Sequence, residues 1–148
     1  MKIASTNKEI GYKYEVKEKI ECGIALKGTE VKSIRDSKLN IKDSFALIKD
    51  GEVILKNMYV APYEHGNINN VNETRDRKLL LHKSEILRLV GSIKQNGYTL
   101  IPSKVYFNNQ HVKVELALCK GKKLYDKRES IKEKEVKRRL DKLTKQNG

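Results

Sequence analysis

The chain has 148 residues, and its 32 Lys and Arg outnumber its 19 Asp and Glu to give a formal net charge of +13 at pH 7. This length fits one domain with an appendage, and the positive charge favours a nucleic acid or an anionic membrane surface as the partner. No apolar run is long enough to span a membrane and no signal-peptide core is present. The two cysteines, Cys22 and Cys119, do not make a disulfide framework, so we expect a cytoplasmic location.

The first third of the chain predicts a strand followed by a helix. Residues 1–10 are polar, and we expect them to be loosely held. Alternating apolar and charged side chains over residues 12–16 predict a half-buried strand, which ends at Cys22-Gly23. Residues 24–35 lack proline and are rich in helix formers. A glycine inside a helix costs about 1 kcal/mol relative to alanine, so Gly28 is interpreted as a point of close approach to another backbone or a ligand.

The middle of the chain predicts a hairpin and a long loop. Residues 39–48 and 52–60 are two strand-like runs around Asp50-Gly51, which is a strong hairpin signal. Residues 61–76 follow as a loop, and loops of this length in compact domains are often functional. The loop leads into three basic residues, which could clamp phosphates or form an ordinary solvated charge run: Arg75, Arg77 and Lys78.

The end of the body predicts a second helix and a second hairpin. Residues 83–96 carry an apolar stripe at helical spacing, and Gly97 is placed as the helix C-terminal cap. Residues 98–107 and 111–119 alternate as two strands around Asn108-Asn109-Gln110. The fold is therefore predicted to be mainly β with two or three short helices, as a small antiparallel barrel, with oligonucleotide-binding barrels as one candidate class.

The sequence contains no recognisable catalytic or metal-binding motif. The three histidines and two cysteines lack metal-ligand spacing, so we expect no metal, no cofactor and no catalytic residue. A hydrolase assembled from distant residues stays open as an alternative. Five aromatic residues could stack on unpaired bases, although their position in strands favours a role in the barrel wall: Tyr59, Tyr63, Tyr98, Tyr106 and Phe107.

The last segment, residues 120–148, is a basic tail with 12 Lys and Arg against five Asp and Glu. It has too few apolar residues to offset the entropy of ordering the chain alone. Val136, Leu140 and Leu143 would share one helical face. We therefore expect residues 1–119 to form the β-barrel, and residues 120–148 to be disordered, or helical when bound to a polyanion.

A specific resemblance joins these observations. Residues 23–35 read Gly-Ile-Ala-Leu-Lys-Gly-Thr-Glu-Val-Lys-Ser-Ile-Arg, which strongly resembles the signature of the SmpB family, the SsrA-binding proteins of bacterial trans-translation. Further matches follow in the expected order, at residues 40–44, 75–81, 121–123, 126–128 and 131–133. The resemblance covers nearly the whole chain.

The resemblance implies an oligonucleotide-binding-like barrel that binds the transfer-RNA-like domain of transfer-messenger RNA and delivers this RNA to stalled ribosomes. The tail would enter the empty small-subunit decoding site and message channel. The RNA-contact positions of the family match four residues here: Asn7, Glu21, Leu80 and Lys113. The ribosome-contacting part of the tail would be Gly121, Lys122, Lys123, Tyr125, Asp126, Lys127 and Arg128.

Three residues depart from the family pattern. His82 replaces a frequent Asn, Tyr125 replaces a frequent His, and Val136 replaces a frequent Trp. A tyrosine can still stack on a base, whereas a valine cannot.

The sequence leaves several alternatives to the adaptor function. A general single-stranded RNA or ribosome-binding barrel is the main alternative, and it would show no preference for a folded RNA. A small nuclease would cleave RNA. A membrane-surface helix in the tail is least favoured, because the apolar face lacks Trp and Phe, so we expect no membrane partner. We also expect Glu21, Leu80 and Lys113 to converge on one face of the barrel.

Overall fold

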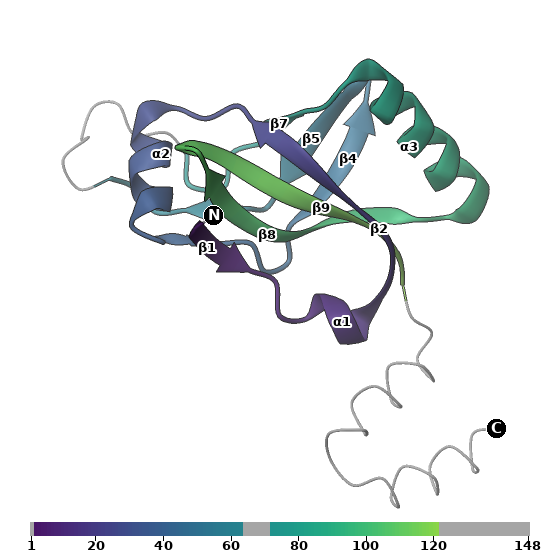
Figure 1. Ribbon diagram of the computed structural model, residues 1–148, viewed down its shortest axis with the longest axis horizontal. Helices are drawn as coiled ribbons and strands as arrows, with labels where there is room; N and C mark the ends of the chain where they lie inside the picture. Colours follow the sequence, from purple (N-terminus) through teal and green to yellow (C-terminus); the bar gives the residue numbers. More distant parts are fainter. Residues whose placement is uncertain (1, 64–71, 122–148) are drawn as a thin grey trace, which may run out of the picture.

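The computed structural model describes residues 2–63 and 72–121. In this part of the chain, strands dominate and three helices lie between them (Figure 1). The elements in chain order are β1 (Lys2–Thr6), α1 (Ile10–Lys13), β2 (Tyr14–Ile24), α2 (Gly28–Arg35), β3 (Leu39–Asn40), β4 (Phe45–Lys49), β5 (Glu52–Lys56), β6 (Tyr59–Val60), β7 (Arg77–Leu80), α3 (Lys83–Asn96), β8 (Thr99–Asn108) and β9 (His111–Gly121).

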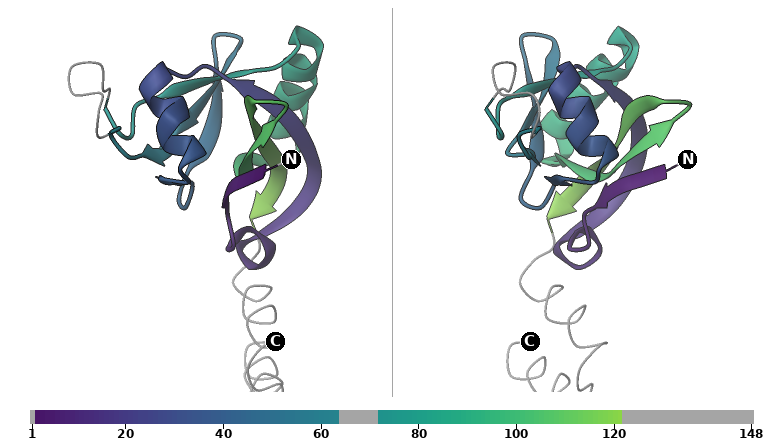
Figure 2. Two further views of the ribbon diagram at one scale, coloured as in Figure 1. Left: turned by 60° about the vertical axis from the view of Figure 1, so that its left-hand side comes forward. Right: turned by 90° about the vertical axis from the view of Figure 1, so that its left-hand side faces the viewer.

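Seven of the strands form one antiparallel sheet in the order β1-β8-β4-β5-β7-β2-β9. An additional pairing of β8 with β9 closes every strand of this sheet except β1 into a barrel-like ring. One edge of β8 pairs with two strands. Leu100 of β8 pairs with Ala46 of β4, and later residues of β8 pair with β1. Figure 2 shows β2 curving along one side of the molecule from α1. The prediction of a mainly β fold with two or three short helices is confirmed.

The hydrophobic core fills the inside of the ring. Its side chains come from strands all round the ring, and those that are at most 1% exposed include Val53, Leu55, Leu79, Leu100 and Leu116. A smaller cluster of Ile101, Ala117 and Cys119 lies on the opposite face of β8 and β9, where Ile10 and Tyr14 pack against it. The molecule therefore buries both faces of the β8–β9 hairpin near α1.

The expectation for the N-terminal residues is wrong. Residues 2–6 form β1, which pairs with β8 from Lys2 opposite Phe107 to Thr6 opposite Lys104. The following strand begins at Tyr14, since Ile10–Lys13 forms a helical turn. It also continues through Cys22-Gly23 to Ile24, because β9 pairs with it as far as Gly23 and β7 pairs with Gly23 and Ile24. These ladder hydrogen bonds outweigh the weakness of a glycine in a strand.

The expectation that another backbone closely approaches Gly28 is also wrong, and the approach of a ligand there stays a prediction. The helix begins at Gly28, four residues after the expected start at residue 24, and a Cβ added at Gly28 would meet nothing within 4 Å. The close approach occurs at Gly23 instead, where a Cβ would lie 3.2 Å from the Cβ of Leu80. Gly23 thus lets the Leu80 side chain lie directly over β2.

Local turn signals are confirmed where they depend on the chain alone. Asp50 and Gly51 adopt φ angles of 52° and 76° between β4 and β5, as a two-residue hairpin turn requires. Gly97 ends α3 in the left-handed conformation. The run expected as one strand over residues 39–48 is split into β3 and β4, with Asp43 at a φ of 63°. Residues 52–60 are likewise split into β5 and β6, with Asn57 at a φ of 64°.

Candidate nucleic-acid interface

One row of side chains crosses the outer face of five neighbouring strands. Gly23 of β2 lies opposite both Leu80 of β7 and Lys113 of β9, and Tyr106 of β8 lies opposite both Lys113 and Ile3 of β1. Directly opposed residues of an antiparallel pair share a face of the sheet. Leu80 and Ile3 are each 50% exposed, so the face that carries this row is the outer one. We call these five residues the outer row.

Glu21 lies on the same face as the outer row, two residues before Gly23, and is exposed. Its carboxylate accepts a hydrogen bond from the hydroxyl of Tyr106 through Oε2. Glu21, Leu80 and Lys113 therefore lie on one face of three adjacent strands, which confirms that they converge. Their contact with RNA remains a prediction.

The charges around the outer row are unevenly paired. Glu115 lies opposite Glu21, and its carboxylate accepts a 2.7 Å hydrogen bond from Ser103 and lies 3.5 and 3.6 Å from the ammonium groups of Lys19 and Lys104. Burial raises the pKa of Glu115, but the hydrogen bond and the two lysines lower it by more, so it stays ionised. Within the described residues, the Lys113 ammonium has no hydrogen bond or ion pair of its own. It is therefore available to an anion.

Asn7 lies beyond β1, at the edge of this face. It is only 9% exposed. Its backbone N–H donates to the Ser103 carbonyl at 2.8 Å, and its Oδ1 accepts the N–H of Glu9 at 3.1 Å. Asn7 lines a cavity of about 300 Å³ together with Glu9, Lys13 and Ser44. These hydrogen bonds fix the chain between β1 and α1, so the first role that the structure assigns to Asn7 is positional.

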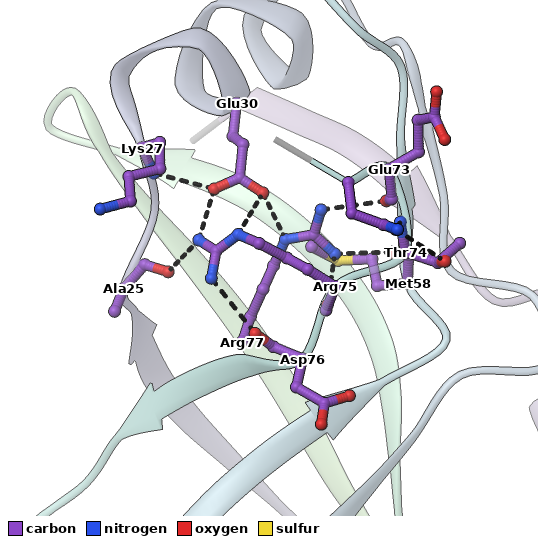
Figure 3. Close-up of polar contacts among 10 residues, drawn as sticks. Ala25, Lys27, Glu30, Met58, Glu73, Thr74, Arg75, Asp76 and Arg77 are labelled. Carbon is purple, nitrogen blue, oxygen red and sulfur yellow. Dashed lines mark hydrogen bonds and ion pairs between the residues drawn. The ribbon is translucent and has the colours of Figure 1, made fainter. Parts of the chain in front are cut away.

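Arg75 and Arg77, two of the residues expected to clamp phosphates, instead contact a carboxylate of the protein itself (Figure 3). Arg75 donates to Glu30 from Nε at 3.1 Å and from Nη2 at 2.6 Å, and Arg77 donates to the same carboxylate from Nε at 2.7 Å. The remaining donors of Arg77 reach the carbonyls of Met58 at 2.6 Å and Glu73 at 3.0 Å. Two arginines thus converge on one acid that is only 3% exposed.

Arg77 fits neither interpretation of the basic run, the phosphate clamp or the solvated charge run. The Arg77 side chain is 0% exposed, so it cannot offer its guanidinium to a phosphate, and the Arg75 side chain is 26% exposed. Lys78 alone is exposed, and its ammonium lies 2.6 Å from the carboxylate of Glu52. The two arginines instead join α2, the end of the long loop and the start of β7.

The electrostatics of Glu30 follow from these contacts. Burial raises the pKa of its carboxyl, but hydrogen bonds from Arg75, the Lys27 amide and Arg77 lower it by more, so the net shift is downward. Because the Lys27 N–H donates to Glu30 at 2.8 Å, the same carboxylate also caps the start of α2.

Two residues at this surface were given no role from the sequence: Gly23 of the outer row and Glu30, which anchors the arginine cluster. Tyr106 was predicted only as a possible stacking or barrel-wall residue, not as a neighbour of Lys113. A signal for Tyr106 exists in the β8–β9 turn, where Asn109 and Gln110 both have positive φ and form a two-residue loop. Counting back from a two-residue turn, rather than the expected three, places Tyr106 opposite Lys113.

Most of the predicted tail contacts lie outside the described residues, namely Lys122, Lys123, Tyr125, Asp126, Lys127 and Arg128. Gly121 is the last residue of β9 and pairs with Tyr14. In residues 2–63 and 72–121, no group of three or more His, Cys, Asp or Glu could hold a metal ion. In that same part of the chain, no helix is long and apolar enough to cross a membrane.

Comparisons with known proteins match almost the whole chain. A family model described as SmpB protein matches residues 4–146. An SsrA-binding protein of Caldicellulosiruptor saccharolyticus is 54% identical over 146 residues, covering 99% of this chain and 92% of that protein. One of Thermosipho africanus is 51% identical over 148 residues, covering 99% of each. A solved structure described as "tmRNA-SmpB: a journey to the center of the bacterial ribosome" contains a chain that is 50% identical with a TM-score of 0.69, covering 85% of this chain and 92% of that chain.

Proposed function

The chain belongs to the SmpB protein family, and on that premise we propose that it is an RNA-binding adaptor for transfer-messenger RNA. It binds the transfer-RNA-like domain of this RNA and delivers it to stalled ribosomes in the cytoplasm, without catalysing a reaction itself. The observation that carries the proposal is the identity of 51–54% to SsrA-binding proteins along 99% of the chain. A match of this extent includes both the strands and the basic C-terminal segment.

The outer row and Glu21 are the proposed RNA-contacting surface. Lys113 supplies an ammonium, unpaired within the described residues, for a phosphate or a base. The exposed Leu80 side chain supplies an apolar contact, and Glu21 supplies a hydrogen-bond acceptor. Asn7 lies at the edge of the same surface. Lys78 points to the outer face beside Leu80 and can reach the RNA backbone if it exchanges Glu52 for a phosphate.

The arginine cluster has a supporting part in this proposal. Arg77 begins β7, and Leu80 ends the same strand. Because Arg77 and Arg75 tie the start of β7 to Glu30 of α2, they hold the strand that presents Leu80. We therefore assign Arg75 and Arg77 to positioning the interface, with Arg75 alone exposed enough to touch a phosphate as well.

The basic tail, residues 120–148, is proposed to bind the ribosome, a role separate from the RNA binding of the strands. The strands hold the RNA, and the segment after Gly121 enters the decoding site and message channel of the small ribosomal subunit, where it becomes helical. Ordering this segment costs conformational entropy, so it should occur only where ribosomal RNA phosphates supply the opposing charge. Lys122, Lys123, Tyr125, Asp126, Lys127 and Arg128 are the proposed ribosome-contacting residues.

Removal of the basic tail tests whether RNA binding and ribosome binding are separate roles of the two parts of the chain. The structure indicates that the cut should follow Gly121 and not Cys119, because Lys120 and Gly121 still pair with β2. We expect the truncated protein to retain most of its affinity for the transfer-RNA-like domain and to lose peptide tagging in a reconstituted translation system. The full chain is the reference in both assays. Tagging at the full rate by the truncated protein would refute the role of the tail.

A salt titration and a competitor separate the adaptor from a general RNA-binding barrel. Phosphate-dominated binding predicts that log K falls linearly with log salt, with a slope of roughly −0.7 to −0.9 per contact. An unstructured RNA of equal length should compete poorly with the transfer-RNA-like domain. Equal competition would favour the general single-stranded RNA-binding module instead.

A further inference from the structure

Tyr106 is an outward-facing aromatic residue that is almost completely covered. It belongs to the outer row, yet it is only 4% exposed. The Lys104 ammonium lies 5.5 Å from its ring centroid, and its cross-strand neighbours are Lys113 and Ile3. A base needs an open ring face for stacking, so this ring cannot serve as a stacking platform in the way an exposed tyrosine could.

The functional group that Tyr106 does present is its hydroxyl. Burial and the neighbouring Glu21 raise the pKa of Tyr106, so the hydroxyl keeps its proton and donates it to Glu21 Oε2. In the described part of the chain, no hydrogen bond or ion pair engages the other oxygen, Oε1. The carboxylate of the exposed Glu21 is thus held at Oε2 by Tyr106 and is open at Oε1.

We propose that Tyr106 is a positioning residue, whose hydroxyl orients the Glu21 carboxylate so that Oε1 accepts a hydrogen bond from the exocyclic amino group of an unpaired base. This inference rests on the proposed function, and it adds the chemical class of base that the surface reads. Adenine, cytosine and guanine carry such an amino group, and uracil does not. An ionised carboxylate only accepts hydrogen bonds, so it cannot bind the carbonyl oxygens of a base.

Two features of the surface explain why orientation matters here. A free glutamate side chain samples many rotamers, and a carboxylate that is already fixed loses less entropy when the RNA binds. Lys113 lies diagonally from Glu21 across the β2–β9 pair, which corresponds to about 7–8 Å between such positions. An acceptor and a donor at this separation suit the edge of one nucleotide, with Lys113 on a ring acceptor or on the adjacent phosphate.

A double-mutant cycle tests the coupling, with the full-length protein and the transfer-RNA-like domain of transfer-messenger RNA as the probe. Tyr106→Phe removes only the hydroxyl and keeps the ring under Lys104. We expect it to weaken binding roughly 10- to 150-fold, as loss of a hydrogen bond to a charged group would. In a Glu21→Ala background, Tyr106→Phe should cause no further loss. Tyr59→Phe is the matched control, since Tyr59 is 41% exposed on β6 of the separate two-stranded sheet, and it should bind as the wild type does.

Analogue interference identifies the base and separates positioning from simple stability. RNA carrying purine riboside, inosine or pyrimidin-2-one riboside in place of adenosine, guanosine or cytidine, respectively, lacks individual amino groups. With the wild type, one position should show loss of binding. With Tyr106→Phe and with Glu21→Gln, this position-specific signal should disappear, whereas a merely structural tyrosine would weaken binding at all positions alike. Glu21→Gln keeps the test valid if Tyr106→Phe folds poorly, because Glu21 is exposed.

The outcomes distinguish this inference from the proposed function. If the wild-type protein binds the RNA but Tyr106→Phe retains full affinity, or adds its loss on top of Glu21→Ala, the positioning role is refuted and the adaptor function stands. If the wild type does not bind the transfer-RNA-like domain, both are refuted.

Discussion

The substitution Glu30→Gln should destabilise this protein more than any exposed charge substitution. Glu30 accepts hydrogen bonds from the Lys27 amide and from Arg75 and Arg77, and it is only 3% exposed. Glutamine keeps the volume of the side chain, but it removes the charge and replaces one acceptor oxygen with an NH₂ donor. That donor would face an arginine N–H, so the buried Arg77 guanidinium would lose its counter-ion.

The magnitude follows from the type of pair. Breaking a buried ion pair by removing one partner costs about 3–5 kcal/mol. The loss of two charge-assisted hydrogen bonds at about 1.5–3 kcal/mol each gives a similar total of about 3–6 kcal/mol. Since domains are stable by about 5–15 kcal/mol in total, Glu30→Gln should remove a large share of the free energy of unfolding. The corresponding fall in Tm is roughly 10–20 °C.

Urea unfolding followed by circular dichroism at neutral pH measures this loss. The matched control is Glu18→Gln, because Glu18 pairs with Arg88 at 2.6 Å but the two side chains are 39% and 48% exposed. An exposed pair contributes about 0–1 kcal/mol. If both variants lose the same small amount of stability, Glu30 is not the anchor described above.

The pH dependence of the same pair has a definite sign. The pKa of Glu30 is lowered from its ordinary value of 4.5 in the folded state, so its ionised form stabilises the fold above that value. This contribution is lost as the pH falls through the folded-state pKa. The difference in stability between wild type and Glu30→Gln should therefore be largest near neutrality and should shrink below about pH 4.5. A difference that grows on acidification would contradict the ion pair.

Two further predictions concern buried contacts of the sheet. Gly23→Ala places a Cβ 3.2 Å from the Leu80 Cβ and should displace Leu80, so RNA affinity should fall and the free energy of unfolding should fall by about 1 kcal/mol. The control Gly28→Ala, whose Cβ meets open space, should leave RNA affinity unchanged. Equal RNA affinity for the wild type, Gly23→Ala and Gly28→Ala would contradict this. Burial raises the pKa of Cys22 to about 12 and that of Cys119 to about 11. A thiol reagent at about pH 8 should therefore label neither cysteine in the folded protein and both in denaturant. Rapid labelling of the folded protein would show that the two thiols are accessible.

Some elements of this protein are encoded locally, and these were predicted correctly. The apolar stripe of residues 83–96 and the glycine after it correspond to α3 with Gly97 in the left-handed conformation. Asp50-Gly51 forms the predicted turn, because positive φ at both positions depends only on the residues themselves. The alternation over residues 111–119 likewise identified which side chains of β9 face outward, Lys113 among them.

Other features depend on partners that are distant in the chain. Residues 2–6 have no pattern that requires a strand, and they become β1 because β8 offers an unpaired edge. The helix expected from residue 24 starts at Gly28, since residues up to Ile24 are held in β2 by β7 and β9. In each case the free energy of a long-range ladder exceeds a local preference that amounts to about 1 kcal/mol or less per residue.

The basic residues show the same limit most clearly. Arg75, Arg77 and Lys78 are nearly equivalent in sequence, and composition could not say which of them meets solvent. Strand alternation turns Arg77 inward and Lys78 outward, and burial of Arg77 is tolerable only because Glu30, 47 positions earlier, lies against it. The identity and order of the charges follow from the sequence. The contact between Glu30 of α2 and Arg77 of β7 decides which of these charges is buried and paired within the protein and which remains exposed to a partner, because a buried charge must be neutralised.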